Sequence, residues 1–248
     1  MDLNSDLGES FGTYTLGNDA GLMPLITSAN IACGFHAGDP QVMDRTVGLA
    51  KQFGVAVGAH PGYPDLAGFG RRKIDATENE IEDFVLYQVA ALAGFARAHG
   101  VSLRHVKPHG ALYNVAATNL AVARAIAQGI ARFDPTLILV GLANSALVQA
   151  AGQAGLRAAR EGFADRSYSP DGTLRSRREP GAVHATAELA AQQALDLARD
   201  RRVTAFDGSV IALEVDTICL HGDTPNAVEY ARAVRQALTG AGIKVQPL

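Results

Sequence analysis

Short apolar, β-branched stretches alternate along this chain with longer stretches in which apolar residues recur at helical spacing. Strands separated by amphipathic helices are typical of parallel sheets joined by crossover helices. Seven such units favour a seven-stranded parallel β/α barrel over an open sheet. The predicted strands lie at residues 1–6, 25–32, 55–59, 103–107, 137–141, 156–160 and 217–220.

Helix start signals fall in the gaps between these strands. A capping residue followed by proline opens predicted helices at Asp39-Pro40 and again at Thr224-Pro225. Thr77 and Glu80 form a capping box before a further amphipathic run. Residues 168–181 are rich in polar residues and arginines. They show neither the helical spacing of apolar residues nor the alternation typical of a strand. They form either a solvated loop or a loop that covers the site and offers arginines to an anionic substrate.

Composition narrows the class of protein. The chain has 248 residues with 48% apolar content, enough for one barrel domain spanning residues 1–248. A net charge of -3 gives no electrostatic case for nucleic acid. No stretch is long and apolar enough to cross a bilayer and no signal peptide is evident, so we expect a soluble cytoplasmic protein. Cys33 and Cys219 are expected to be buried free thiols, with a soft-metal site built on both as the alternative.

Four histidines follow predicted strands at turns that contain glycine or proline: His36, His60, His109 and His221. In α/β barrels the turns after the strands carry the chemistry, and imidazole is well suited to bind a metal or to move a proton near neutral pH. The repeated placement therefore predicts an enzyme. Three other histidines lack this placement and are interpreted as structural: His99, His105 and His184.

Polar residues occupy alternate positions of the first predicted strand. Asp2, Asn4 and Asp6 share the face that points into a barrel. Burial of two carboxylates requires a metal, a cation or a hydrogen-bond network, and a purely structural network is one interpretation. Glu9 follows this strand and is a candidate acid or base. Lys107 falls at an inward-facing position of its own strand, where its ammonium can stabilise developing negative charge.

The region after the sixth predicted strand contains Glu161, Asp165 and Arg166, whose spacing is as compatible with a helix cap or a surface ion pair as with a role in the site. No Walker motif and no dinucleotide fingerprint follows a strand. The chain therefore shows no nucleotide-binding loop of its own.

Several motifs together resemble the LamB/YcsF family over essentially the whole chain. They are Asp2-Leu-Asn-Ser-Asp-Leu-Gly-Glu9, Asn30-Ile-Ala-Cys-Gly-Phe-His-Ala-Gly-Asp-Pro40, Gly58-Ala-His-Pro-Gly-Tyr-Pro-Asp65, Gly68-Phe-Gly-Arg-Arg72, Val106-Lys-Pro-His-Gly-Ala-Leu-Tyr-Asn114, Glu161-Gly-Phe-Ala-Asp-Arg166 and Ile218-Cys-Leu-His-Gly-Asp-Thr-Pro225. The resemblance implies a barrel related to polysaccharide deacetylases. It also implies the ATP-dependent opening of 5-oxo-L-proline to L-glutamate, together with 5-oxoprolinase subunits B and C.

The same resemblance suggests roles for individual residues. The related deacetylases hold a divalent ion with one aspartate and two histidines, and Asp6, His60 and His109 are the nearest equivalents by strand order. A metal-free acid–base array is the alternative. Glu9 or Asp6 is expected to act as general base, with His109 also catalytic. The remaining candidates are Lys107 for oxyanion charge, Arg71 or Arg72 for the substrate carboxylate, His36 and Asp223 for proton transfer, and Asn4, Asn30, Glu161, Arg166 and His221 around the substrate.

Two other functions stay open at this stage. A metal-dependent amidohydrolase or carbohydrate deacetylase acting without ATP would use the same barrel and the same three ligands. A non-catalytic subunit would use the histidine-lined mouth only to bind a small acid. If ATP takes part, the lack of a phosphate loop suggests that it is bound largely by a partner or at a site that the sequence does not reveal.

Overall fold

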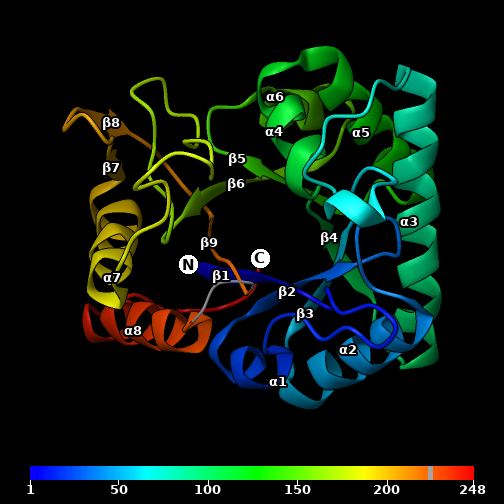
Figure 1. Ribbon diagram of the computed structural model, residues 1–248, viewed down its shortest axis with the longest axis horizontal. Coiled ribbons are helices and arrows are strands. Elements are labelled where there is room, and N and C mark those ends of the chain that lie inside the picture. The colour runs from blue at the N-terminus through cyan, green and yellow to red at the C-terminus, as the bar shows by residue number, and fades with distance from the viewer. Residues whose placement is uncertain (223–225) are drawn as a thin grey trace.

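The computed structural model describes residues 1–222 and 226–248, and its centre is a closed parallel barrel in the strand order β1-β2-β3-β4-β5-β6-β9 (Figure 1). The seven-stranded barrel expected from the sequence is confirmed. The strands are β1 (Asp2–Leu7), β2 (Ser28–Ala32), β3 (Ala56–His60), β4 (Leu103–Val106), β5 (Ile138–Leu142), β6 (Arg157–Phe163) and β9 (Thr217–Leu220).

Each predicted strand overlaps an observed one, and the differences lie at the ends. The predicted strand 25–32 begins only at Ser28, because residues 23–25 form a 3₁₀ turn with Pro24 in its first positions. β6 extends to Phe163, three residues beyond the prediction. β1 and β9 pair in parallel from Asp2↔Thr217 onward and close the barrel.

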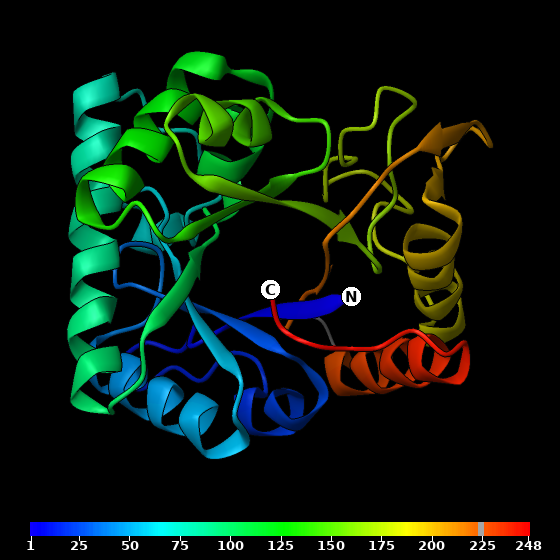
Figure 2. The ribbon, with the colours of Figure 1, turned by 180° about the vertical axis from the view of Figure 1, so that it is seen from behind.

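Helices surround the barrel (Figures 1 and 2). They are α1 (Asp19–Leu22), α2 (Pro40–Phe53), α3 (Glu78–Ala98), α4 (Gly110–Thr118), α5 (Leu120–Phe133), α6 (Ala146–Gln153), α7 (Ala187–Leu195) and α8 (Ala227–Gly240). Asp39 caps α2 as predicted, and the predicted capping box of Thr77 and Glu80 starts α3. The predicted cap at Thr224-Pro225 lies outside the described residues.

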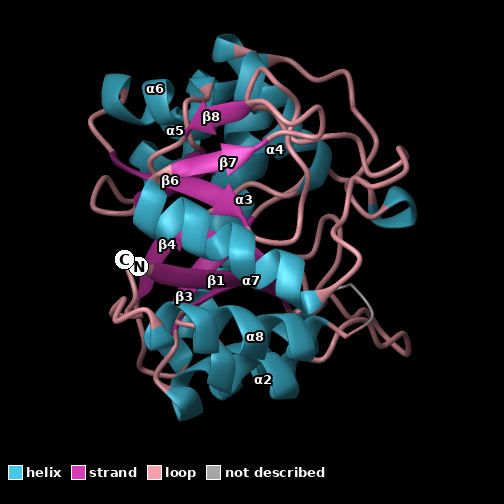
Figure 3. Cartoon of the chain, turned by 90° about the vertical axis from the view of Figure 1, so that its left-hand side faces the viewer, coloured by secondary structure: helices cyan, strands magenta, loops and turns pink. Residues whose placement is uncertain are grey.

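A long excursion separates β6 from β9. It contains an irregular segment at residues 164–186, then α7 and a short antiparallel ribbon of β7 (Arg202–Thr204) and β8 (Val210–Ala212). In the side view this ribbon lies in front of the barrel strands, at the edge of the molecule that faces the viewer (Figure 3). The sequence did not predict the ribbon.

Both chain termini lie at the amino ends of the barrel strands, where the Gln246 amide donates to the Met1 carbonyl (Figure 2). Substrate chemistry is therefore expected at the opposite rim. Among the helices in the described part of the chain, none has the length and apolarity needed to cross a membrane.

Candidate functional site

The four histidines of the strand-end turns all lie at the carboxyl rim of the barrel. His60 ends β3, His109 is the N-cap of α4, and His221 directly follows β9. His36 lies four residues beyond the end of β2. A cavity of about 710 Å³ opens over this rim, within the roughly 300–1,000 Å³ typical of small-molecule sites. Site residues that line it include Asp6, Glu9, His60, Lys107, His109 and His221.

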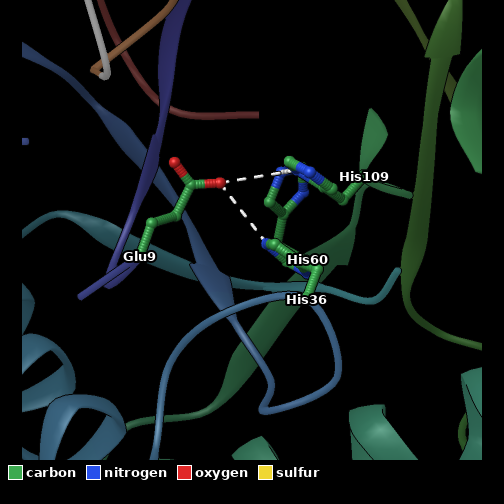
Figure 4. A group of neighbouring side chains, drawn as sticks. All are labelled: Glu9, His36, His60 and His109. Atoms are coloured by element: carbon green, nitrogen blue, oxygen red, sulfur yellow. Dashed lines mark hydrogen bonds and ion pairs between the residues drawn. The ribbon is translucent and has the colours of Figure 1, made fainter. Parts of the chain in front are cut away.

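Three of these histidines and one carboxylate form a buried group that we call the histidine cluster: Glu9, His36, His60 and His109 (Figure 4). His60 Nε2 lies 3.0 Å from His109 Nδ1. Glu9 Oε1 lies 3.4 Å from His109 Nδ1 and 3.4 Å from His36 Nε2. The His36 ring stacks on the His109 ring with 3.7 Å between centroids. Side chains from separate loops thus converge on one point.

Backbone carbonyls fix the hydrogen positions of two of these rings. His60 Nδ1 is 2.6 Å from the Lys107 carbonyl oxygen, and His109 Nε2 is 2.8 Å from the Phe69 carbonyl oxygen. A carbonyl only accepts, so each of these nitrogens is assigned the proton. The 3.0 Å contact between His60 Nε2 and His109 Nδ1 is therefore a hydrogen bond only when one of the two rings carries a second proton.

The electrostatic setting favours the neutral forms of His36 and His109. Burial, followed by the charges of His60 and other neighbours, lowers the pKa of His109 to about 3. Burial, followed by the charges of His109 and His60, holds the pKa of His36 well below 6.5. His36 Nδ1 is also buried without a hydrogen-bond partner among the described residues. Both rings are therefore neutral near neutral pH, and the unprotonated nitrogen of each could ligate a cation.

A strained turn presents the carbonyl that orients His109. Phe69 has φ +55°, in the left-handed region that a non-glycine residue seldom adopts. Gly70 follows with φ +62°, and a Cβ there would stand 2.7 Å from His109 Cδ2 and 2.8 Å from His36 Cβ. The Gly68-Phe69-Gly70 turn is therefore shaped by the two stacked rings.

Lys107 is the centre of a second buried group, below the histidine cluster. Its Nζ lies 3.0 Å from Asp6 Oδ1, 2.8 Å from Glu161 Oε1 and 3.1 Å from Asn4 Oδ1. Burial lowers the pKa of Lys107, but the charges of Asp6 and other neighbours outweigh it and raise the pKa well above 10.5. Lys107 is therefore a permanent cation shared between two carboxylates.

Asp6 links the two groups. Its Oδ1 accepts from Lys107 and from Asn30 Nδ2, and its Oδ2 lies 3.3 Å from His60 Nε2. Burial raises the pKa of Asp6, but the charges of His60 and Lys107 outweigh it, so the pKa falls well below 3.8. Asp6 is therefore a carboxylate throughout the physiological pH range.

Amides and a further histidine hold Asp6 from behind. Asn30 Nδ2 donates to Asn4 Oδ1 as well as to Asp6, and Asn30 Oδ1 lies 2.7 Å from His105 Nε2. Asn4 Nδ2 donates to Glu161 Oε1 at 2.9 Å. The structure thus brings Asn4, Asn30 and Glu161 beneath the cavity rather than into its lining.

The opposite side of the cavity carries a separate ion pair. His221 Nδ1 lies 2.9 Å from Asp165 Oδ2, and the His221 ring stacks on Phe163. Arg166 is 6% exposed, lines the cavity and donates to the carbonyls of Ala182 and Arg175. Burial, followed by the charge of a neighbouring arginine, lowers the pKa of Arg166 to about 10.

The two arginines of the Gly68–Arg72 motif differ in position. Arg71 lines the cavity, with its guanidinium 4.9 Å from the centre of the Phe69 ring. Arg72 is bound to Asp65 and does not line the cavity. The polar segment 168–181 does line it, through residues that include Arg175, Arg177 and Arg178. Of the two interpretations of this segment, a solvated loop or a loop that covers the site, the second therefore fits the structure. Asp223 lies outside the described residues.

Two participants were not singled out as site residues from the sequence. Tyr113 donates to Glu161 Oε2 at 2.6 Å from α4, four residues after His109. Helical spacing from His109 could have found it. His105, interpreted as structural, belongs to the network behind Asp6, while His99 pairs on the surface with Asp44 and His184 with Gln193.

The histidine cluster could hold a metal ion, because one ligand atom from each member lies within 4.8 Å of all the others. A second such group contains Asp6, Cys219 and His221. Cys33 belongs to neither group, and both cysteines are buried free thiols as predicted. The set expected by analogy, Asp6, His60 and His109, shares two members with the histidine cluster.

Known proteins similar to the chain point to one family. The model of the LamB/YcsF family matches residues 1–248. A Tolumonas auensis protein, named as the A subunit of 5-oxoprolinase, is 54% identical over 100% of this chain and 99% of its own. A Methylococcus capsulatus protein of the same name is 57% identical over 100% of this chain and 95% of its own. The crystal structure of a lactam utilization protein from Thermus thermophilus is 48% identical, covers 100% of this chain and 99% of its own, and has a TM-score of 0.95.

Proposed function

The chain belongs to the LamB/YcsF family, and on that basis we propose that it is the subunit that opens the lactam of 5-oxo-L-proline to L-glutamate within an ATP-dependent 5-oxoprolinase. Full-length relatives that are named as the A subunit of this enzyme support the role. The observation that carries it is the histidine cluster beside Lys107 at the floor of the cavity.

Substrate binding follows from the charges around the cavity. The substrate carboxylate binds to Arg71 or Arg166, the arginines at the cavity wall that stood among the sequence candidates. The lactam oxygen then points to the floor, where the Lys107 ammonium faces negative charge that develops on it. Asn4, Asn30 and Glu161 position Lys107 and Asp6 for this role.

Hydrolysis also requires a base that accepts a proton from water. Two carboxylates stand beside the imidazoles, Asp6 next to His60 and Glu9 next to His109, and we assign the base to this pair. His36, His221 and Asp223 complete the proposed proton-transfer groups, of which His221 is oriented by Asp165.

ATP makes the ring reactive, and we assign its binding to partner subunits B and C because no phosphate loop is present in the sequence. Transfer of the terminal phosphoryl group to the lactam oxygen weakens the amide resonance of the ring. Water then adds to the ring carbon, the C–N bond breaks, and the nitrogen takes up a proton. The acyl phosphate that results reacts with a second water to give glutamate and phosphate.

A divalent ion is part of the proposal. His60 and His109 would hold it with a neighbouring carboxylate, for which the sequence suggested Asp6. When bound, such an ion supplies Lewis-acid polarisation of the substrate oxygen.

A reconstitution tests the function. The purified chain is combined with subunits B and C, and both L-glutamate formation from 5-oxo-L-proline and ADP release are followed. We expect glutamate only when all three proteins and ATP are present, and loss of glutamate when the chain carries Lys107→Met. Glutamate formation by the chain alone would contradict the division of labour. Unchanged activity of a complex that lacks the chain would contradict the catalytic role.

A further inference from the structure

Arg166 is a buried cation in the cavity wall that follows β6. It is 6% exposed, and its hydrogen bonds go to backbone carbonyls, from Nε to Ala182 at 3.1 Å and from Nη2 to Arg175. Within residues 1–222 and 226–248, no carboxylate oxygen lies within 4.0 Å of its guanidinium. Most of its five N–H groups therefore have no acceptor in this part of the chain. Burial of such a charge is costly unless an anion binds to it.

Further cations lie on the same wall. Arg177 and Arg178 belong to the segment that follows Arg166, and both line the cavity. Burial, followed by the charge of Arg177, lowers the pKa of Arg166 to about 10, which places these two guanidiniums close together. The buried carboxylate of this wall, Asp165, has both oxygens within 3.0 Å of His221 Nδ1. One carboxylate therefore stands against two neighbouring arginines, and the wall is positively charged.

The acidic residues that line the described cavity have partners of their own. Asp6 pairs with Lys107 at the floor, and Glu9 lies in the histidine cluster. Asp171 is exposed and accepts from the backbone and the hydroxyl of Thr173. The wall at Arg166 is therefore the part of the cavity suited to an anion that enters from solution.

This wall begins next to the point where the lactam oxygen is placed by the proposed function. Single ligand atoms of Asp6 and His221 lie within 4.8 Å of each other. The Phe163 ring joins the two regions, because its centre is 5.3 Å from Lys107 Nζ and its other neighbour is the stacked His221 ring. A phosphoryl group on a lactam oxygen at Lys107 therefore extends toward His221 and Arg166. On the other side, the histidine cluster presents a carboxylate, which repels phosphate.

The chemistry of the wall suits a phosphoryl group better than a carboxylate. A phosphoryl group carries close to two negative charges and three strong acceptor oxygens. Planar guanidiniums bind such oxygens through paired hydrogen bonds. Two neighbouring guanidiniums therefore match a dianion, whereas the single charge of a carboxylate would leave one of them unbalanced.

We propose that Arg166, Arg177 and Arg178 form a phosphate-binding subsite of this chain. The subsite holds the phosphoryl group of the phosphorylated lactam while water opens the ring, and until phosphate leaves. This inference rests on the proposed function and deepens it, since ATP binds to the partner subunits but the phosphorylated substrate binds here. The substrate carboxylate is then bound by Arg71, which belongs to the turn beside the histidine cluster.

Calorimetric titration of the full chain with inorganic phosphate tests the subsite without an enzyme assay. We expect one phosphate per chain and an affinity for acetate that is at least about tenfold weaker. Arg166→Gln should weaken phosphate binding by about 10- to 100-fold, as expected for losing a hydrogen bond to a charged group. Arg232→Gln is the matched control at an exposed position of α8, and it should bind phosphate as the wild type does.

Two further variants define the subsite. Arg166 also holds the carbonyls of Ala182 and Arg175, so Arg166→Gln is checked by thermal unfolding. If it fails to fold, the exposed Arg178→Gln replaces it, with an expected loss of about two- to fivefold. Arg71→Gln should keep the phosphate affinity within about twofold at physiological ionic strength, because more distant charges are screened.

Four results would overturn the subsite. They are the absence of saturable phosphate binding, acetate that binds as tightly as phosphate, folded Arg166→Gln or Arg178→Gln protein with wild-type affinity, and an equal loss in Arg71→Gln and Arg166→Gln, which would make one anion site of both arginines. Failure of the proposed function gives a different result. Phosphate binding without glutamate formation in the reconstituted complex would contradict the function and leave the anion site intact. Glutamate formation with a chain that binds no phosphate would do the reverse.

Discussion

Two polar layers inside the same barrel differ in how their hydrogen bonds balance. The amino-terminal layer consists of Asp2, Thr27, Ser28 and Thr217. Both Thr27 and Ser28 donate to Asp2 Oδ1, at 2.6 and 2.7 Å, and Thr217 donates to Asp2 Oδ2. Every carboxylate oxygen in this layer has a hydroxyl donor. The carboxyl-terminal layer is the histidine cluster, where the 3.0 Å contact between His60 Nε2 and His109 Nδ1 needs a proton or a cation between the two nitrogens.

This barrel buries polar groups at both ends. The contrast between the two layers distinguishes the polar groups that stabilise the fold from those that serve a function. Asp2 and Glu9 are buried to similar extents, at 2% and 7% exposed. The exposed fraction alone would therefore not distinguish these two carboxylates. Their partners distinguish them, because Asp2 accepts from three hydroxyls that stabilise the fold, whereas Glu9 lies against two imidazoles that can take part in chemistry.

Between the two layers, Lys107 has the largest expected effect on stability. Lys107→Met leaves Asp6 and Glu161 buried without their cation, which should lower the free energy of unfolding by about 3–5 kcal/mol. Urea denaturation measures it. The control Lys73→Met, at an exposed position, should stay within about 0.5 kcal/mol of wild type. An equally small effect of Lys107→Met would show that the middle of the barrel is not organised by charge.

In the amino-terminal layer, Asp2→Ala should cost about 1–3 kcal/mol, because three hydroxyls lose their acceptor. The folded variant should form glutamate in the reconstituted complex at the wild-type rate. Urea denaturation measures the loss of unfolding free energy, and the glutamate assay measures the rate. A large loss of activity in fully folded Asp2→Ala protein would remove the distinction between the layers.

In the carboxyl-terminal layer, the same kind of change should have the opposite sign. Glu9→Gln replaces an acceptor with an amide that can donate to an imidazole lone pair. We expect metal-free Glu9→Gln to be more stable than metal-free wild type by about 0.5–2 kcal/mol, in line with stabilising changes at functional sites. Thermal unfolding in chelator measures it. A destabilised Glu9→Gln protein would mean that the cluster is satisfied without an ion.

The smallest effect is on the pH dependence of stability. Burial is the main cause that raises the pKa of Asp2 above 3.8, against its hydroxyl hydrogen bonds. The folded state then binds the proton more tightly than the unfolded state, so this contribution to stability falls as pH rises from 3.8 through the folded pKa. The difference in unfolding free energy between wild type and Asp2→Asn should change in that window and be constant above it. A constant difference throughout would contradict the raised pKa.

Much of the fold follows from local pattern. The apolar runs and caps, such as Asp39 before α2, appear in sequence because they satisfy local rules of helix and strand formation. The segment from residue 164 to β8 does not, because it follows neither the helical period nor a strand alternation long enough to recognise. Its β7–β8 ribbon is only three residues per strand.

The site, like the fold, has features that the sequence predicts and features that it does not. The alternation of Asp2, Asn4 and Asp6 and the strand-end turns of the histidines indicated which residues face the barrel interior and its rim. Which of them contact one another depends on long-range contacts that no local pattern carries, such as the Phe69 carbonyl against His109. The same limit explains Arg72, whose motif suited substrate binding but whose nearest carboxylate is Asp65.

The most direct test compares kcat/KM for 5-oxo-L-proline in complexes reconstituted with Glu9→Gln or with Asp2→Asn. The account predicts a loss of about 100-fold or more for Glu9→Gln, whose carboxylate serves the chemistry, and a change of less than about twofold for Asp2→Asn. Equal losses in the two folded variants, or full activity with Glu9→Gln, would contradict the claim that the histidine cluster is the catalytic centre.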